Sequence, residues 1–274
     1  REGSSRPGRD ERKGSEKRSF SRDSRGPRKD DRGVRKDSGE RKPFVKKPGF
    51  GAPHQPRKRI FEPDFPEEIT GENLEKSVRA ELLSLSAENG AYVSKHLESV
   101  HYFSEIDPER SYQHALAAAH HAGRLAVVRE TAGYAAYRAG HYEVALRELR
   151  AAHRISGDVS IWPVMADCER GLGNPLKALK MAGSPEVKRL GKAEEIEMRI
   201  VAAGARRDLG EPEAAVITLQ CKELSNVKEP WAVRLRYAYA DALESCGRRD
   251  EARQWFKKAA EVDFEEETDA SERS

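Results

Sequence analysis

Four histidines come closest to the spacing of a metal site. His114 and His121 are seven residues apart, which places them on one face of a helix, with His120 beside them and His101 upstream. A structural zinc ion takes four Cys, His or carboxylate ligands, and no Cys or carboxylate completes this set at helical spacing. Packed or solvated helix histidines explain the pattern more simply. We therefore expect no metal site and no cofactor.

Cys168 lies between Asp167 and Glu169 in the sequence MADCERG. A reactive thiol needs a positive environment near a base, and neighbouring carboxylates oppose formation of the thiolate. The sequence therefore favours a buried helix thiol over a nucleophile. All three cysteines are far apart, odd in number and outside any CxxC motif, which fits reduced thiols and predicts a cytoplasmic protein.

The sequence lacks the common catalytic signatures. It has no Walker loop, no Gly-x-Gly-x-x-Gly after a strand, no His-Glu-x-x-His and no Gly-x-Ser-x-Gly. No apolar run approaches the roughly 18 residues that a membrane span requires. We therefore predict a protein that is not an enzyme, with no small-molecule substrate and no membrane partner. An enzymatic function is kept only as a third hypothesis.

The charges divide the chain into two parts. The 274 residues carry 50 Lys and Arg against 47 Asp and Glu, a formal net charge of +3. Residues 1–59 hold 21 basic and 9 acidic side chains, a net charge of +12, which leaves −9 for the rest. Large apolar residues are few in the first part, so burial cannot offset roughly 1–2 kcal/mol of backbone entropy per residue. We expect that part to be disordered.

The end of this basic segment is a candidate polyanion contact. From residue 41 onward its charges are purely basic and alternate with aromatic residues. Lys and Arg displace counterions from phosphates, and an occasional Phe stacks on an unpaired base. The candidate contacts for RNA or the ribosome are Arg41, Lys42, Phe44, Lys46, Lys47, Phe50, Arg57, Lys58 and Arg59. The alternatives are a solubilising tail, or a tail that contacts its own acidic body.

A repeated helix-turn-helix pattern follows from about residue 124. Glycines recur at Gly140, Gly173, Gly210 and Gly247, with spacings of 33, 37 and 37 residues. Each glycine follows a helix that contains small residues and precedes a second helix with Ala five residues later. A helix pair of this size cannot bury its apolar stripe alone, so each pair must cover the next. The pattern predicts an all-α solenoid of stacked helix pairs.

These residues resemble the tetratricopeptide repeat (TPR) family. Ala145, Ala178, Ala215 and Ala252 occupy one register of the second helices, and a larger residue follows one turn later as Leu149, Leu219 and Phe256. The resemblance covers about residues 125–263. It implies a TPR-like helical-repeat solenoid whose first-helix side chains line a concave groove that binds peptides or partner proteins. With its basic tail, the whole chain is similar to uncharacterised actinobacterial members of the family.

Residues 61–123 are expected to form an acidic linker and more degenerate helices of the same stack. Asn89-Gly90 predicts a helix end, because Gly tolerates the left-handed conformation, and Asp107-Pro108 predicts a helix start. The expected division is a basic disordered tail over 1–60, this linker and helix region over 61–123, TPR-like repeats over 124–263, and a short acidic disordered tail over 264–274.

First-helix residues that packing does not require are the candidate contacts of a partner protein: Tyr134, Arg138, Asp167, Arg170, Arg207, Arg234, Tyr237 and Asp241. Arg and Tyr are enriched at binding hot spots. One hypothesis is a groove that receives an extended, partly acidic peptide. The alternative is that these arginines pair with Asp208, Asp241 or Glu244 between repeats.

Two function classes follow from these patterns. The first is a non-enzymatic protein–protein interaction scaffold that binds a partner or peptide in the solenoid groove. The second is an RNA- or ribosome-associated factor that uses the basic N-terminal arm for non-specific nucleic-acid binding. The salt dependence of RNA binding, and its loss on deletion of residues 1–59, would distinguish them.

Overall fold

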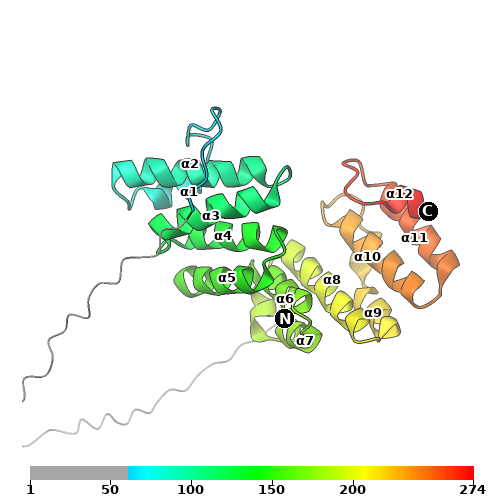
Figure 1. The fold of residues 1–274 in the computed structure, drawn as a ribbon. Coiled ribbons are helices and arrows are strands. Elements are labelled where there is room, and N and C mark those ends of the chain that lie inside the picture. The colour runs from blue at the N-terminus through cyan, green and yellow to red at the C-terminus, as the bar shows by residue number, and fades with distance from the viewer. Residues whose placement is uncertain (1–60) are drawn as a thin grey trace, which may run out of the picture. The chain divides into compact units, whose positions relative to one another are not determined.

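The computed structural model describes residues 61–274, and all regular structure in that range is helical (Figure 1). The predicted disordered tail, with its candidate polyanion contacts from Arg41 to Arg59, lies outside the described residues. Neighbouring helices pack against each other along the chain. The prediction of an all-α body is therefore confirmed for residues 61–274.

Three helices come first: α1 (Lys76–Leu82), α2 (Ala87–Phe103) and α3 (Pro108–Ala122). The Ser86 hydroxyl caps α2 by accepting a 3.3 Å hydrogen bond from the backbone N–H of Asn89. The Asp107 carboxylate caps α3 in the same way at 3.0 Å, with Pro108 in the first turn as predicted. The predicted helix end at Asn89-Gly90 is wrong, because the Ser86 cap places both residues in the first turn of α2.

The segment that precedes α1 is fastened to α2 and α3. The Tyr92 hydroxyl donates a 2.7 Å hydrogen bond to the Glu62 carboxylate, whose other oxygen lies 2.8 Å from Nε2 of His121. Ile69 and Leu74 are buried at 7% and 6% exposure, so their apolar surface joins the body. The acidic linker predicted for this region is therefore packed against the first helices.

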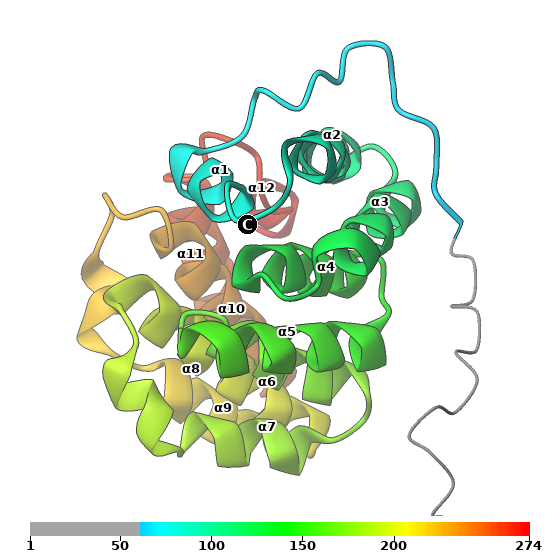
Figure 2. The ribbon, with the colours of Figure 1, turned by 90° about the vertical axis from the view of Figure 1, so that its left-hand side faces the viewer.

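Four helix pairs occupy the rest of the described range: α4 (Ala126–Arg138) with α5 (Tyr142–Ser156), α6 (Trp162–Gly171) with α7 (Pro175–Ala182), α8 (Lys192–Asp208) with α9 (Pro212–Leu219), and α10 (Ala232–Ser245) with α11 (Arg249–Ala260). The short 3-10 helices η1 (Pro185–Arg189) and η2 (Lys222–Ser225) precede α8 and α10. Each helix contacts the next one along the chain (Figures 1 and 2). In addition, α8, which is the first helix of its pair, contacts the first helices of the two neighbouring pairs, α6 and α10.

The turn inside each pair has one conformation, repeated four times. Its glycine has a positive φ of 77°, 74°, 75° and 76° at Gly140, Gly173, Gly210 and Gly247. The backbone N–H that follows each glycine bonds back to a carbonyl five residues earlier, at 2.8 to 3.0 Å, which closes the last turn of the first helix. Only glycine adopts this left-handed conformation without a Cβ penalty. The glycine spacing of the sequence therefore marks the turn inside each pair correctly.

Small residues allow the two helices of a pair to approach closely. Ala145, Ala178, Ala215 and Ala252 are at most 1% exposed, as their shared register predicts. Leu149 and Phe256 fill the next turn and are fully buried. A Cβ added to Gly133 on α4 would lie 2.5 Å from the Leu149 side chain on α5, so this crossing requires a glycine. The core is a series of clusters between successive helices, typical of stacked repeats.

The chain after α11 folds back onto the last pair. The acidic composition of residues 264–274 predicts a disordered tail, yet Ala270–Arg273 forms the short helix α12, which packs against α11. Ala270 is fully buried in the cluster of α10 and α11, and Arg273 forms ion pairs with Asp241 and Glu244 of α10. Amino-acid composition does not predict this packing, because the packing depends on two individual residues, Ala270 and Arg273. None of the helices in residues 61–274 is long and apolar enough to cross a membrane.

Candidate protein-binding site

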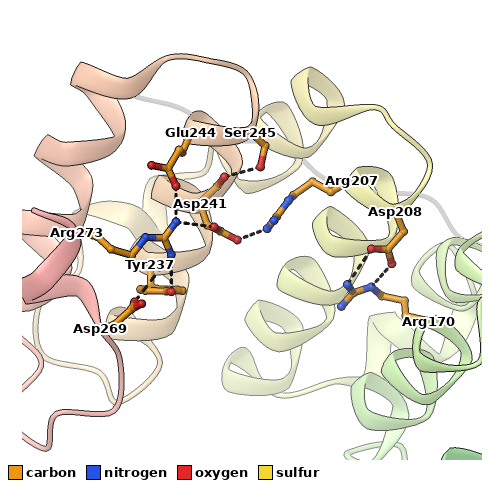
Figure 3. A network of polar contacts seen from close by, with 9 residues as sticks. All are labelled: Arg170, Arg207, Asp208, Tyr237, Asp241, Glu244, Ser245, Asp269 and Arg273. Atoms are coloured by element: carbon orange, nitrogen blue, oxygen red, sulfur yellow. Dashed lines mark hydrogen bonds and ion pairs between the residues drawn. The ribbon is translucent and has the colours of Figure 1, made fainter.

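The eight predicted contact residues lie on the first helices of the four pairs. Tyr134 and Arg138 are on α4, Asp167 and Arg170 on α6, Arg207 on α8, and the remaining three on α10. α6, α8 and α10 contact one another in that order, so their side chains form one connected surface. Figure 3 shows Arg170 and Arg207, each bonded to a carboxylate of the neighbouring pair.

Arg170 links α6 to α8. Its guanidinium donates hydrogen bonds of 2.8 and 3.3 Å to the two carboxylate oxygens of Asp208 (Figure 3), and a third of 2.7 Å to Asp167. Asp167 in turn accepts a 2.5 Å hydrogen bond from the Tyr137 hydroxyl on α4. A Cβ at Gly204 would lie 2.5 Å from Cζ of Arg170, so Gly204 gives the guanidinium room on α8. Asp167 and Arg170 therefore hold three pairs together.

Arg207 links α8 to α10 through an ion pair with Asp241 (Figure 3). The other oxygen of Asp241 accepts a 3.0 Å hydrogen bond from Arg273 of α12. Arg273 also donates a 2.6 Å hydrogen bond to the Tyr237 hydroxyl. The structure thus brings Arg207, Tyr237 and Asp241 together. For Arg207 it agrees with the alternative hypothesis from the sequence, in which the arginines pair with carboxylates of a neighbouring repeat. The sequence pattern missed Arg273, because nothing in composition places residue 273 on α10.

Arg234 lies at the edge of an open cleft of about 800 Å³ between α8, α10 and the segment after α11. Its guanidinium donates a 2.8 Å hydrogen bond to Glu197 of α8, while 57% of its side chain stays exposed. Burial raises the pKa of Glu197, and the nearby Arg234 opposes that rise. The cleft is lined by Lys192, Ala193, Glu197, Glu223, Asn226, Glu229, Pro230, Trp231, Arg234 and Glu267.

Tyr134 and Arg138 stand apart from this group. Tyr134 is half-buried against α5 and α6, and burial, helped by Glu130, raises its pKa to about 12, so its hydroxyl stays protonated at neutral pH. Arg138 pairs with Glu105 in the loop between α2 and α3, with both side chains largely exposed. Pairs of this kind contribute little stability, so Arg138 keeps its capacity to exchange partners.

The charge of the cleft opposes an acidic ligand. Four glutamates line it against one lysine and one arginine, which gives a formal charge of −2. The arginines at positions 138, 170, 207 and 234 each have a carboxylate partner. An acidic peptide would have to displace those carboxylates and then face the glutamates of the cleft. A cationic peptide meets complementary charge there, so the geometry favours the opposite sign to the sequence hypothesis.

The histidine and cysteine candidates hold no arrangement for chemistry. Cys168 is fully buried, and burial, with Asp167 and Glu169, raises the pKa of its thiol to about 12. His114 is buried against another histidine, and His121 pairs with a carboxylate of the segment before α1. Within residues 61–274, no group of three or more His, Cys, Asp and Glu side chains is placed to hold a metal ion.

Comparison with known proteins gives no further guide to this site. No protein-family model matches the chain, and no curated protein matches its sequence. The TPR resemblance therefore rests on the residue pattern.

Proposed function

We propose that residues 61–274 form a TPR-like solenoid that acts as a non-enzymatic interaction scaffold and binds a cationic peptide segment of a partner protein along its first helices. The single observation that carries this proposal is the open acidic cleft of about 800 Å³ between α8 and α10. Its volume is within the range of binding clefts, roughly 300–1,000 Å³. The repeated glycine turns and buried alanines support the TPR-like architecture.

The lining of the cleft suits such a ligand. Trp231 contributes apolar surface to the lining, and Glu223, Glu229 and Glu267 contribute negative charge. Apolar contacts combined with charged groups are usual in a specific interface. Arg234 is the one cation on α10 in the lining, and its ion pair with Glu197 leaves it largely exposed.

Charge reversal at one lining residue of the cleft tests the proposal. A suitable probe is a labelled peptide with the sequence of residues 41–59, which is basic and contains aromatic residues. We expect Glu229→Lys to weaken its binding to the full chain about five- to tenfold at moderate salt, because two units of charge change beside the ligand. Glu213→Lys on α9, an exposed residue outside the cleft, is the matched control and should leave affinity unchanged.

Arg234→Glu distinguishes the two signs of ligand charge. It should strengthen binding of the basic peptide if the cleft receives cations, whereas it would weaken binding of an acidic peptide of the same length. Equal affinity of wild type, Glu229→Lys and Arg234→Glu for the basic peptide would remove the cleft from the binding site. Circular dichroism of each variant establishes that the helices are intact.

We infer as a second candidate an RNA- or ribosome-associated factor, because residues 1–59 carry a net charge of +12. Counterion release makes such binding fall steeply with salt. RNA affinity of the full chain should therefore drop by orders of magnitude between low and moderate salt and disappear when residues 1–59 are deleted. RNA binding that survives this deletion would contradict a role for the arm.

A further inference from the structure

The last helix pair holds an arginine side chain in a fully formed site. Nη1 of Arg273 donates to the Tyr237 hydroxyl at 2.6 Å, and Nη2 donates to Asp241 at 3.0 Å and to Glu244 (Figure 3). All three acceptors lie on α10, so the site is fixed by one rigid helix. Hydrogen bonds between a guanidinium and carboxylates are among the strongest that side chains make.

Aromatic rings complete the same site. Cζ of Arg273 lies 4.1 Å from the ring centroid of Phe256 and 5.3 Å from that of Tyr237. Phe256 is fully buried, so its ring is held in place by the core of the last pair. Carboxylates at its edge and aromatic rings near its face suit the planar guanidinium of arginine, which the compact ammonium of lysine does not match.

The segment that delivers Arg273 is held by few contacts of its own. Within residues 264–274, Ala270 is the one buried side chain, and Phe264 is 86% exposed. Asp263 organises the turn by accepting hydrogen bonds from the backbone N–H groups of Glu267 and Thr268. A helix of four residues has no independent stability. The occupant is therefore replaceable, whereas the site on α10 and α11 is built into the core.

We propose that Tyr237, Asp241, Glu244 and Phe256 form a subsite for an arginine side chain of the partner peptide, and that Arg273 occupies this subsite in cis until the partner displaces it. This proposal rests on the proposed function. It adds that arginine is the residue of the cationic peptide that the subsite recognises. Glu267 of the same segment lines the acidic cleft, so the subsite and the cleft are adjacent parts of one surface.

Occupation of the subsite by Arg273 raises the partner concentration that is needed for binding. A tethered group has an effective concentration in the millimolar range, so a peptide in trans competes poorly with it. Removal of the Arg273 side chain should lower the concentration of peptide that is needed for binding. The full chain is tested as wild type, as Arg273→Ala, and as Arg248→Ala, which removes an exposed arginine that pairs with Glu251 outside the subsite.

The probe is a labelled peptide with the sequence of residues 264–274, FEEETDASERS, and its binding is followed by fluorescence anisotropy. We expect Arg273→Ala to bind it at least about tenfold more tightly than wild type or Arg248→Ala. A peptide with Lys in place of Arg should lose that gain, as should Arg273→Ala combined with Asp241→Asn. Equal affinities of wild type and Arg273→Ala, or equal binding of the Arg and Lys peptides, would overturn the proposal.

This experiment fails independently of the proposed function. The probe carries five acidic residues and one arginine, so it reports the subsite and not the attraction of the cleft for cations. If the basic peptide responds to Glu229→Lys while Arg273→Ala changes nothing, the cleft binds cations and the arginine subsite is refuted. If Arg273→Ala gains affinity while Glu229→Lys has no effect, the subsite holds and the cleft is refuted.

Discussion

The Nδ1 atoms of His96 on α2 and His114 on α3 lie 3.0 Å apart in the interior of the protein. Both side chains are fully buried, and their Nε2 atoms have no hydrogen-bond partner. The ring of Phe65, from the segment before α1, covers the pair with centroid distances of 4.6 and 5.9 Å. One Nδ1 must donate and the other accept, so the accepting imidazole must be neutral, and protonation of both rings breaks the hydrogen bond.

This pair predicts that acid destabilises the protein. Burial lowers the pKa of both histidines from 6.5 to about 4. Below pH 6.5 the unfolded chain therefore binds more protons than the folded one, and the free energy of unfolding falls until about pH 4. Urea unfolding between pH 4 and 8 should show constant stability above pH 6.5 and a steady loss below it.

Two variants separate the pair from the other acid-sensitive groups. His114→Gln removes one titrating imidazole, so its stability should depend less steeply on pH in this window. His120→Gln, in the last turn of α3 and outside the pair, should reproduce the wild-type slope. The same slope in all three proteins would assign the acid sensitivity to groups other than His96 and His114.

Gly133→Ala should lower the free energy of unfolding by about 1–3 kcal/mol. The new Cβ would lie 2.5 Å from the Leu149 side chain and 3.2 Å from its backbone nitrogen, so α4 and α5 must separate. Gly90→Ala on α2 is the matched control, because its new Cβ would meet no atom closer than 3.5 Å. That variant should stay within about 1 kcal/mol of wild type, since alanine is the better helix former. Denaturant titration of both variants measures the difference.

Phe256→Ala should cost about 3–5 kcal/mol, the usual range for loss of a fully buried aromatic side chain. Leu176→Ala, whose side chain is 68% exposed on α7, should change stability by less than about 0.5 kcal/mol. Thermal unfolding followed by circular dichroism compares them. A small effect of Phe256→Ala would contradict the packing of the last pair.

Cys168 should be inert in the native protein. Its thiol is fully buried with a pKa of about 12, whereas Cys221 and Cys246 are partly exposed. Burial also raises the pKa of Cys221 and Cys246, so a thiol reagent at pH 8 should label these two slowly in the folded protein and Cys168 only on unfolding. Labelling in denaturant, where all three should react alike, is the control. Rapid reaction of Cys168 in the folded protein would show that its helix opens readily.

Much of the helix pairing could be predicted from local chemistry. Gly140 and its three equivalents mark turns because a positive φ is a property of single residues. The alanines of the second helices mark the close helix crossings, because small side chains are what allow two helices to approach. At Asn89-Gly90 this logic fails, since the competing Ser86 cap decides where α2 begins.

The candidate site was less predictable, because ion pairs between repeats depend on how far one helix is offset from the next. The sequence offers several carboxylates to Arg207 and Arg234, and the structure selects Asp241 and Glu197. The sequence pattern did not indicate Gly204 or Arg273. Gly204 matters because its missing side chain leaves room for Arg170, and Arg273 matters because the chain after α11 folds back onto the last pair.

The division of the core into clusters between successive helices has a thermodynamic consequence. Each cluster joins only a few helices that are close together along the chain, so cooperativity should weaken with distance along the stack. Protonation of the histidines on α2 and α3 should therefore loosen the first helices before the last ones. Ligand binding at α10 should slow amide exchange in α8 to α12 and leave α2 and α3 almost unchanged.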